Sequence, residues 1–259
     1  MDKKKEDRTH VLAENNFRNI KDKQPEVAIL PWGATEAHNY HLPYGTDNYE
    51  TVGIAEEAGR LAMEQGVECL VLPVVPFGVN TGQTDLPGTV NLYPSTQAIV
   101  LHDILESVSN WGIRKFLLLN GHGGNDFKQI LREAGSSFPE MFLVTANWFQ
   151  SVDKSKYFEN DGDHADEMET SLMLHLRPEL VLPLDRAGDG KHGTFSIQEL
   201  NEKWAWSERE WSRVTKDTGI GDPRKATAEK GKAYFDEVCG KIAGLIVGMA
   251  GTDEEGLYR

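Results

Sequence analysis

The sequence of 259 residues predicts an α/β fold, with a mainly parallel sheet in a three-layer αβα arrangement. Short apolar runs at 27–31, 69–75, 115–120 and 141–146 are typical of buried parallel strands. Segments with helical spacing of apolar residues alternate with them, at 48–65, 95–110, 126–134 and 164–176, and a last one spans 227–249. Strands that alternate with helices favour parallel pairing through right-handed crossovers.

The chain can be followed in order from its polar first 24 residues, where 9–20 could form a short helix. Gly66 is expected to end the first long helix, and Ser95 to cap the second. The connection 76–92 is unusually long, and long ordered loops tend to carry function. Residues 178–221 are irregular, and we expect loops and short helices there. Because no shift in composition marks a boundary, we expect a single domain over residues 1–259.

The composition excludes several classes of protein. A formal charge of −14 and a pI near 5.0 argue against binding to nucleic acid, which requires clustered basic residues. Two cysteines in a chain of this length, without a CxxC pair, indicate a reducing compartment. No apolar run approaches 18 residues and no leader segment is visible, so we expect no membrane contact and a cytoplasmic location.

Ligand-type side chains gather directly after the first predicted strand. Glu36, His38, His41 and Asp47 lie within the segment 30–47. Carboxylates and imidazoles at the carboxyl end of a strand suit a divalent metal, and an aspartate can bridge two ions. The alternative is a set of surface polar residues, with Asp47 as the N-cap of the following helix. The sequence suggests a metal-dependent hydrolase built on this segment.

The third predicted strand leads into the motif NGHGGND at 120–126. Its glycines allow tight turns, and His122 lies where a neighbouring parallel strand would bring it towards Glu36, His38 and Asp47. A phosphate-binding loop of a nucleotide-binding domain is the alternative. The spacing matches neither GxGxxG nor the P-loop pattern, so we favour the metal ligand.

A third polar cluster, HADEMETS, begins the fourth predicted helix at His164. Helical spacing would place His164, Glu167 and Ser171 along one stripe, with Glu169 elsewhere. The alternative is an acidic helix N-terminus whose carboxylates complement the helix dipole. That alternative is weaker for Glu169, which lies next to apolar residues and would need a partner if buried.

Taken together, these motifs resemble the creatininase (creatinine amidohydrolase) family. Its members carry patterns close to PxGSxEQHGPHLPLGTD, NGHGGN and HAGExETS, which stand here as PWGATEAHNYHLPYGTD, NGHGGND and HADEMETS. LPGTVNL at 86–92 and GDPRKATAEKGK at 221–232 resemble two further family segments. The resemblance covers the chain from about residue 27 to the last helix, and five ordered motifs are far more specific than one.

The resemblance implies an αβα fold, often hexameric, with two divalent metal ions: zinc, with manganese or iron as alternatives. By motif position Glu36, Asp47 and His122 would hold one ion. His38 and the bridging Asp47 would hold the second, with Glu169 completing it. This follows because Gly124 stands where creatininase proper has another acidic ligand.

The implied reaction is hydrolysis of a C–N bond by a metal-activated hydroxide. His164 is the expected general acid, oriented by Asp163 or Glu167. Trp148 matches a substrate-contacting tryptophan of creatininase, and His41 is expected to help bind the substrate by packing or hydrogen-bonding beside the site.

Asn39, Tyr40 and Asn160 depart from the family pattern, so creatinine itself is not the expected substrate. A cyclic amide, a formamide or a small peptide fits the resemblance. A relative that keeps the metals but acts as a binding or regulatory protein is the competing interpretation. We expect a homo-oligomer, with the tryptophan-bearing segment 195–220 as a contact surface.

Overall fold

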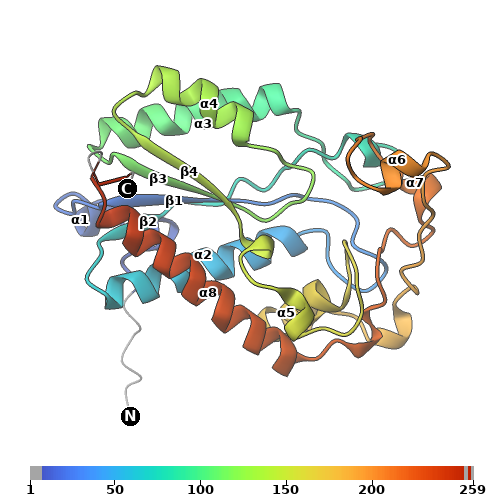
Figure 1. The fold of residues 1–259 in the computed structure, drawn as a ribbon. Coiled ribbons are helices and arrows are strands. Elements are labelled where there is room, and N and C mark those ends of the chain that lie inside the picture. The colour runs from blue at the N-terminus through green and yellow to red at the C-terminus, as the bar shows by residue number, and fades with distance from the viewer. Residues whose placement is uncertain (1–7, 254–255, 258–259) are drawn as a thin grey trace, which may run out of the picture.

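The computed structural model describes residues 8–253 and 256–257, so the first seven residues of the polar N-terminal segment lie outside it. Four parallel strands form one sheet in the order β2-β1-β3-β4 (Figure 1). The strands are β1 (Val27–Trp32), β2 (Cys69–Val71), β3 (Lys115–Asn120) and β4 (Phe142–Asn147). The α/β class with a parallel sheet and helical layers is confirmed.

Helices cover both faces of the sheet (Figure 1). α3 (Pro94–Asn110) and α4 (Lys128–Ser137) lie on one face, and α2 (Thr46–Glu64), α5 (Glu167–Leu176) and α8 (Ala228–Ala250) lie on the other. Successive strand residues point to opposite faces, so Val27 and Ile29 join the core under α2 and α8. Ala28 and Leu30 join the core under α3 and α4 instead.

Several predicted boundaries were wrong for local reasons. β2 ends at Val71, because Pro73 has no N–H to continue the ladder. α3 begins at Pro94 after Tyr93, so Ser95 is not its cap. The expected helix at 9–20 is two short turns, η1 (Leu12–Glu14) and α1 (Phe17–Ile20). The end of α2 before Gly66 is as predicted, and Gly66 has a φ of 88°.

α5 packs closely against α8 on the lower face of the sheet (Figure 1). Gly231 of α8 allows this approach, since a Cβ there would collide with the backbone oxygen of Ser171. The buried Glu167 carboxylate is neutralised by Lys230 of α8 at 2.6 Å and also accepts the backbone N–H groups of Glu159 and Asn160. The start of α5 is thereby fixed.

The segment after α5 is irregular, as predicted. We call residues 187–220 the strap. It contains α6 (Gln198–Asn201) and α7 (Trp211–Val214) and returns to the carboxyl ends of the strands (Figure 1). The remaining short turns of the described chain are η2 (Thr81–Gln83), η3 (Trp148–Gln150), η4 (Lys154–Lys156), η5 (Pro178–Leu180), η6 (Leu184–Arg186) and η7 (Pro223–Lys225). Within the described residues, no helix has both the length and the apolar character needed to cross a membrane.

Candidate metal centre

The carboxyl ends of β1 and β3 lie side by side and carry the first candidate ligands. Trp32 at the end of β1 pairs with Asn120 at the end of β3, so the loops that follow them emerge together. One loop carries Glu36 and His38 and the other carries His122. Neighbouring parallel strands therefore bring together residues that are more than 80 positions apart in the sequence, as predicted.

Asp47 joins them from the first turn of α2. The N-cap of α2 is Gly45, so the interpretation of Asp47 as a helix cap was wrong. Its carboxylate lies at the positive end of the helix dipole and faces two imidazoles instead. Asp47 Oδ1 is 2.9 Å from His38 Nε2, and Asp47 Oδ2 is 2.9 Å from His122 Nδ1. The carboxylate thus spans the two histidines.

Two trios of ligand atoms share Asp47. Glu36, Asp47 and His122 form the first, with His122 Nδ1 2.9 Å from Glu36 Oε1. His38, Asp47 and Glu169 form the second, with His38 Nε2 4.0 Å from Glu169 Oε2. The ligand atoms of each trio lie within 4.8 Å of one another, and all but Glu169 are buried. Such spacing fits a cation with ligand distances of about 2.0–2.2 Å.

The far nitrogen of each imidazole is held by a backbone carbonyl. His38 Nδ1 donates to Glu36 O at 3.1 Å, and His122 Nε2 donates to Val79 O at 3.0 Å. A carbonyl oxygen can only accept, so a proton sits on that nitrogen, and the opposite nitrogen faces the carboxylates, where its lone pair would be available to a cation. Carbonyl-fixed imidazoles of this kind are typical of metal-ligating histidines. The residues present therefore fit two divalent cations.

The buried carboxylates of the site stabilise positive charge on the groups next to them. Burial opposes the charged form of His38, but Asp47 outweighs it and raises the pKa of His38 to about 10. Burial likewise opposes charge on His122, and Glu36 and Asp47 raise its pKa well above the ordinary value. Burial raises the pKa of Glu169 to about 8. A metal cation between these groups would balance the negative charge of the carboxylates in place of protons on the histidines.

The motif HADEMETS is arranged differently from the helical stripe we expected. α5 begins at Glu167, and the carboxylate of Asp166 caps it by accepting the N–H groups of Met168 and Glu169. The helix-terminus alternative therefore holds for Asp166. His164 precedes the helix, pairs with Ile220 of the strap in an antiparallel bridge, and is followed by Ala165 with a φ of 49°. That turn presents Glu169 and His164 to the cluster from different elements.

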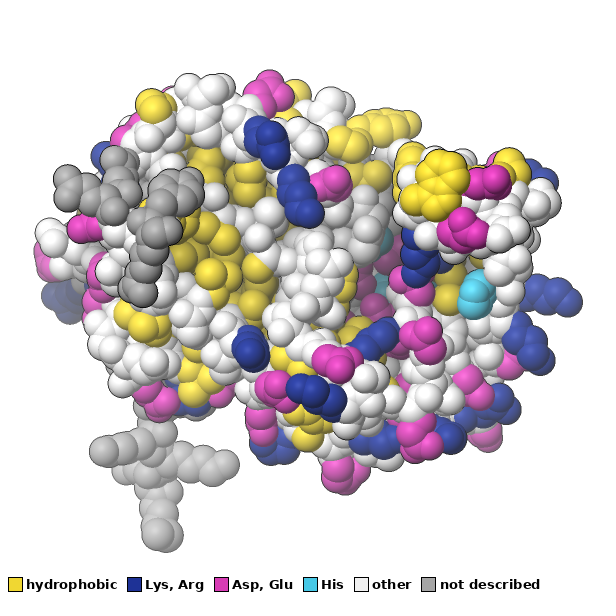
Figure 2. Space-filling model, in the orientation of Figure 1, with side chains coloured by type: hydrophobic (Ala, Val, Ile, Leu, Met, Phe, Trp, Pro, Cys, Tyr) yellow, Lys and Arg dark blue, Asp and Glu magenta, His cyan; other side chains and the backbone are white. Residues whose placement is uncertain are grey.

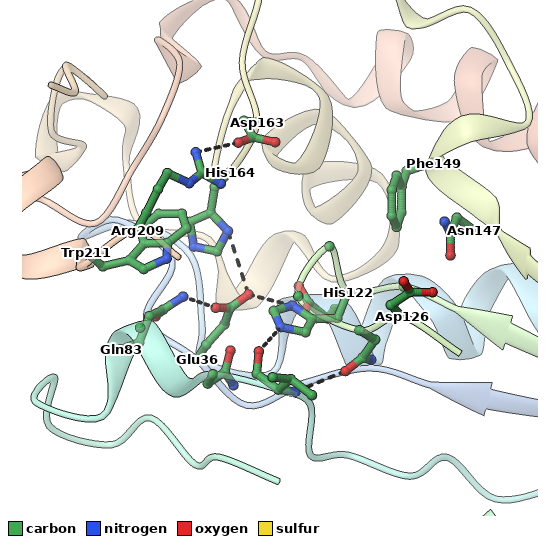
Figure 3. Close-up of a pocket in the computed structure, with 18 of the residues that line it drawn as sticks. Glu36, Gln83, His122, Asp126, Asn147, Phe149, Asp163, His164, Arg209 and Trp211 are labelled. Atoms are coloured by element: carbon green, nitrogen blue, oxygen red, sulfur yellow. Dashed lines mark hydrogen bonds and ion pairs between the residues drawn. The ribbon is translucent and has the colours of Figure 1, made fainter. Parts of the chain in front are cut away.

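His164 lies against the first candidate trio. Its Nε2 donates to Ala37 O at 2.8 Å, and its Nδ1 lies 3.7 Å from Glu36 Oε1 (Figure 3). Burial and the positive charge of His38 lower the pKa of His164, so it rests neutral with a free Nδ1 lone pair. Glu36, His38 and His164 form a third trio of potential ligands.

The expectation that Asp163 or Glu167 orients His164 is not what the contacts show. Asp163 pairs with Arg209 at 2.7 Å, and Glu167 is occupied by Lys230 and two backbone N–H groups. The carbonyl of Ala37 fixes the ring instead. A backbone oxygen leaves no residue-type signal, so sequence could not reveal it.

Trp148 and His41, which are expected to help bind the substrate, are both buried, but Trp148 also lines the cavity in front of the candidate ligands. Trp148 is 1% exposed, donates from its indole to Thr51 Oγ1 at 3.2 Å, and belongs to the apolar cluster under α2 and α8. His41 is 1% exposed, and its Nε2 lies 2.8 Å from Thr170 Oγ1, next to Glu169. Burial lowers the pKa of His41 to about 4. His41 therefore hydrogen-bonds to α5, in agreement with the expectation that it packs or hydrogen-bonds beside the site. It does not line the cavity.

A cavity of about 1040 Å³ opens in front of the candidate ligands. Figure 2 shows the recess between the body of the molecule and the strap, with histidine and acidic side chains inside it. The lining residues that sequence reasoning missed include Gln83, which donates to Glu36, and Arg209 and Trp211 of the strap (Figure 3). The length of the 76–92 loop was a signal for Gln83, but nothing in the irregular strap indicated which of its residues would turn inwards.

Asn39 and Tyr40, which depart from the family pattern, hold the strap. The N–H of Asn39 donates to Thr218 Oγ1 at 2.8 Å, and its side-chain oxygen accepts the N–H of Gly188 at 2.8 Å. Asn39 has a φ of 55°, a conformation that asparagine tolerates better than most residues. Tyr40 Oη donates to the carbonyl of Lys216 at 3.1 Å. Both ends of the strap are therefore tied to the loop that carries Glu36 and His38.

The comparison with known proteins agrees with these motifs. Residues 11–246 match the model of the creatininase family, described as creatinine amidohydrolase. The chain belongs to this family of amidohydrolases, which are enzymes that hydrolyse C–N bonds.

Individual relatives carry several activities. The mycofactocin precursor peptide peptidase of Mycolicibacterium smegmatis is 30% identical over 247 residues, 91% of this chain and 90% of that protein. The 3-dehydro-scyllo-inosose hydrolase of Thermotoga maritima is 33% identical over 172 residues, 61% of this chain, and the match spans only 53% of that enzyme.

Solved structures share the fold. A Bacteroides fragilis protein described as a creatinine amidohydrolase has a TM-score of 0.92 and 46% identity, covering 97% of this chain and 99% of its own. Creatininases at 23% identity, with a TM-score of 0.78, include zinc–zinc and manganese forms.

Proposed function

We propose that this chain is a two-metal amidohydrolase that cleaves a C–N bond of a small amide. Glu36, Asp47 and His122 would hold one cation, and His38, Asp47 and Glu169 would hold the other, with Asp47 shared. The observation that carries the proposal is the pair of imidazoles whose back nitrogens are fixed by Glu36 O and Val79 O. Their front nitrogens converge on the same buried carboxylate.

Two divalent cations bound there would activate a water molecule for attack and polarise the substrate carbonyl. Zinc suits the mixture of imidazole and carboxylate ligands, and manganese or iron are alternatives. In addition, the side chain of Gln83 would hold Glu36 in place by donating to its second oxygen. The ligands other than Glu169 are almost fully buried, which limits the contact of bulk water with them.

His164 is the proposed proton carrier. With Nε2 committed to Ala37 O, its free Nδ1 can take the proton that the attacking water releases. The same nitrogen can return this proton to the departing nitrogen, which is a poor leaving group until protonated. Trp211 packs edge-on against the imidazole, with ring centroids 4.7 Å apart, and limits its rotation. The role is thus base first and acid second, carried by one ring position.

The substrate class is a cyclic amide, a formamide or a small peptide. The relatives named above as hydrolase, peptidase and creatinine amidohydrolase support this range. The glycine loop does not support a nucleotide. It directs His122 at Glu36 and Asp47, which is the arrangement of a metal ligand and not that of a phosphate-binding backbone loop.

Metal analysis combined with turnover tests the proposal. Protein purified without chelator should contain about two metal ions per chain, and a panel of creatinine, other cyclic amides, N-formyl compounds and short peptides should include a substrate. His122→Ala should lose metal and turnover together, whereas His164→Gln should keep both metals and lose turnover. His102→Ala, on the exposed side of α3, is the control and should change neither.

A metal-free preparation with unchanged stability would overturn the metal proposal. Full metal content without turnover on any amide would instead favour the second candidate, a metal-binding relative with a regulatory role. Loss of metal in His164→Gln would place His164 among the ligands, a role that its trio with Glu36 and His38 makes testable.

Assembly into a homo-oligomer, and a hexamer by family resemblance, also belongs to the proposal. The strap exposes Trp204 and Trp206, at 73% and 85%. Large exposed aromatic side chains of this kind favour a contact surface between subunits. Light scattering of the native protein and of a Trp204→Ser/Trp206→Ser variant tests this, since the variant should be a smaller species. A native monomer would contradict it. A cytoplasmic location stays a prediction.

A further inference from the structure

Arg209 stands on the strap side of the cavity, facing the candidate metal ligands. Its guanidinium carbon lies 5.1 Å over the ring of Trp211, which in turn contacts the His164 imidazole (Figure 3). The side chain is 37% exposed and lines the cavity. One aromatic ring therefore separates this permanent positive charge from the proposed proton carrier.

The guanidinium group of Arg209 has more N–H donors than the contacts it makes. It carries five N–H groups, and among the described residues the structure gives it one ion-pair partner, Asp163, 2.7 Å from Nη1. The side chain of Asp163 is 57% exposed, so solvent screens the pair and little holds it together. By contrast, Lys154 in the same cavity is bound to Gly162 O and to the buried Asp166. Of these two cations, Arg209 is thus the one beside His164 that can take up a further ligand; Lys128 also lines the cavity, but from α4.

We infer that Arg209 recognises a carboxylate on the substrate, so that the substrate is an amide bearing an acidic group a few bonds from the scissile C–N bond. The inference rests on the proposed function, because the reacting carbonyl must sit at the Glu36–Asp47 centre. A planar guanidinium fixed on an aromatic face matches a carboxylate through two parallel hydrogen bonds. The cavity, at about 1040 Å³, has room for a substrate that reaches from the metal ligands to the strap.

Matched hydroxamates test the inference by binding alone. A hydroxamate group ligates metal ions, and a chain of about two to four methylene groups can carry either a carboxylate or a primary carboxamide at its far end. Dissociation constants are measured by calorimetry on the zinc-loaded protein. The best carboxylate probe should bind about tenfold to hundredfold more tightly than its carboxamide twin, as expected for hydrogen bonds to a charged group.

Two variants assign this preference to the guanidinium. Arg209→Gln should lose the preference while still binding the carboxamide probe, which also shows that the variant is folded and holds metal. Asp163→Asn releases Arg209 from its partner and should enlarge the preference. If the pair only fastened the strap, Asp163→Asn would weaken both probes alike, and the inference would be overturned.

The outcomes separate the two proposals. Equal binding of both twins to the native protein overturns the carboxylate inference and leaves the two-metal amidohydrolase intact. A preference that survives in Arg209→Gln overturns it as well. Absence of binding by either twin to zinc-loaded protein removes the metal-centred function, and this inference falls with it.

Discussion

Replacement of Gln83 by leucine should weaken the first proposed cation without disturbing the fold. Gln83 lies in η2, is 2% exposed, and donates from Nε2 to Glu36 Oε2, the oxygen opposite the one that faces His122. Leucine has a similar volume and cannot donate. Glu36 then keeps its position in the chain but loses the group that fixes the plane of its carboxylate.

The expected loss follows from the kind of bond removed. A buried hydrogen bond to a charged group contributes about 1.5 to 3 kcal/mol. Since each 1.4 kcal/mol is a factor of ten, the affinity of the Glu36 trio for its cation should fall by about tenfold to hundredfold. Changes to the partners of metal ligands have effects of the same size.

Competition with a chromogenic chelator measures the two stepwise affinities. The His38–Asp47–Glu169 trio does not contact Gln83 and serves as the internal control, so its affinity should stay within about threefold. Unchanged affinity at both sites in a folded Gln83→Leu variant would refute the reasoning, because Glu36 would then be neither a ligand nor oriented by Gln83.

Further predictions concern stability. Gly231→Ala should destabilise the protein by about 1 to 3 kcal/mol, because the added Cβ would meet the backbone of Ser171. Gly240→Ala, in the same helix, is the control: among the described residues its Cβ meets no other atom, so the variant should be neutral or stabilised by up to about 1 kcal/mol. Equal denaturant midpoints for the two variants would contradict the packing argument. His41 has a pKa of about 4 when folded and near 6.5 when unfolded, so the unfolded chain binds the extra proton and stability should fall by up to about 3 kcal/mol between pH 6.5 and pH 4. His41→Gln, which can still reach Thr170, should lose that part of the slope, and an identical pH profile would exclude the assignment. Removal of metal by a chelator should lower the melting temperature reversibly, with a shift that grows with zinc concentration; a melting temperature indifferent to zinc would speak against both cation sites.

Much of the sheet could be predicted because its strands are short apolar runs that are visible in the sequence. The run KFLLLN at 115–120 is apolar on both sides, since helices cover both faces, and β3 has the predicted bounds. The juxtaposition of Glu36, Asp47 and His122 also followed from sequence, because parallel strands end at one edge. These are consequences of periodicity and topology, which are visible in the residue pattern.

What could not be predicted depends on backbone groups and irregular chain. The turn at Ala165 moved His164 out of the helix, and the carbonyls of Ala37 and Val79 fixed the imidazoles. Neither has a residue-type signature. Arg209 and Trp211 reach the cavity through the strap, whose path is set by specific hydrogen bonds and not by periodic apolar residues.

The attachment of the strap by Asn39 and Tyr40 has a consequence for protein engineering. The strap, which carries Arg209, cannot be exchanged for another segment by itself. Both of its ends form hydrogen bonds with Asn39 and Tyr40 in the loop of Glu36 and His38. A chimera that imports the strap of a relative would need the relative's residues at positions 39 and 40 as well. Transplanted together, the two segments form a portable unit with which one metal centre could be given a different choice of substrate.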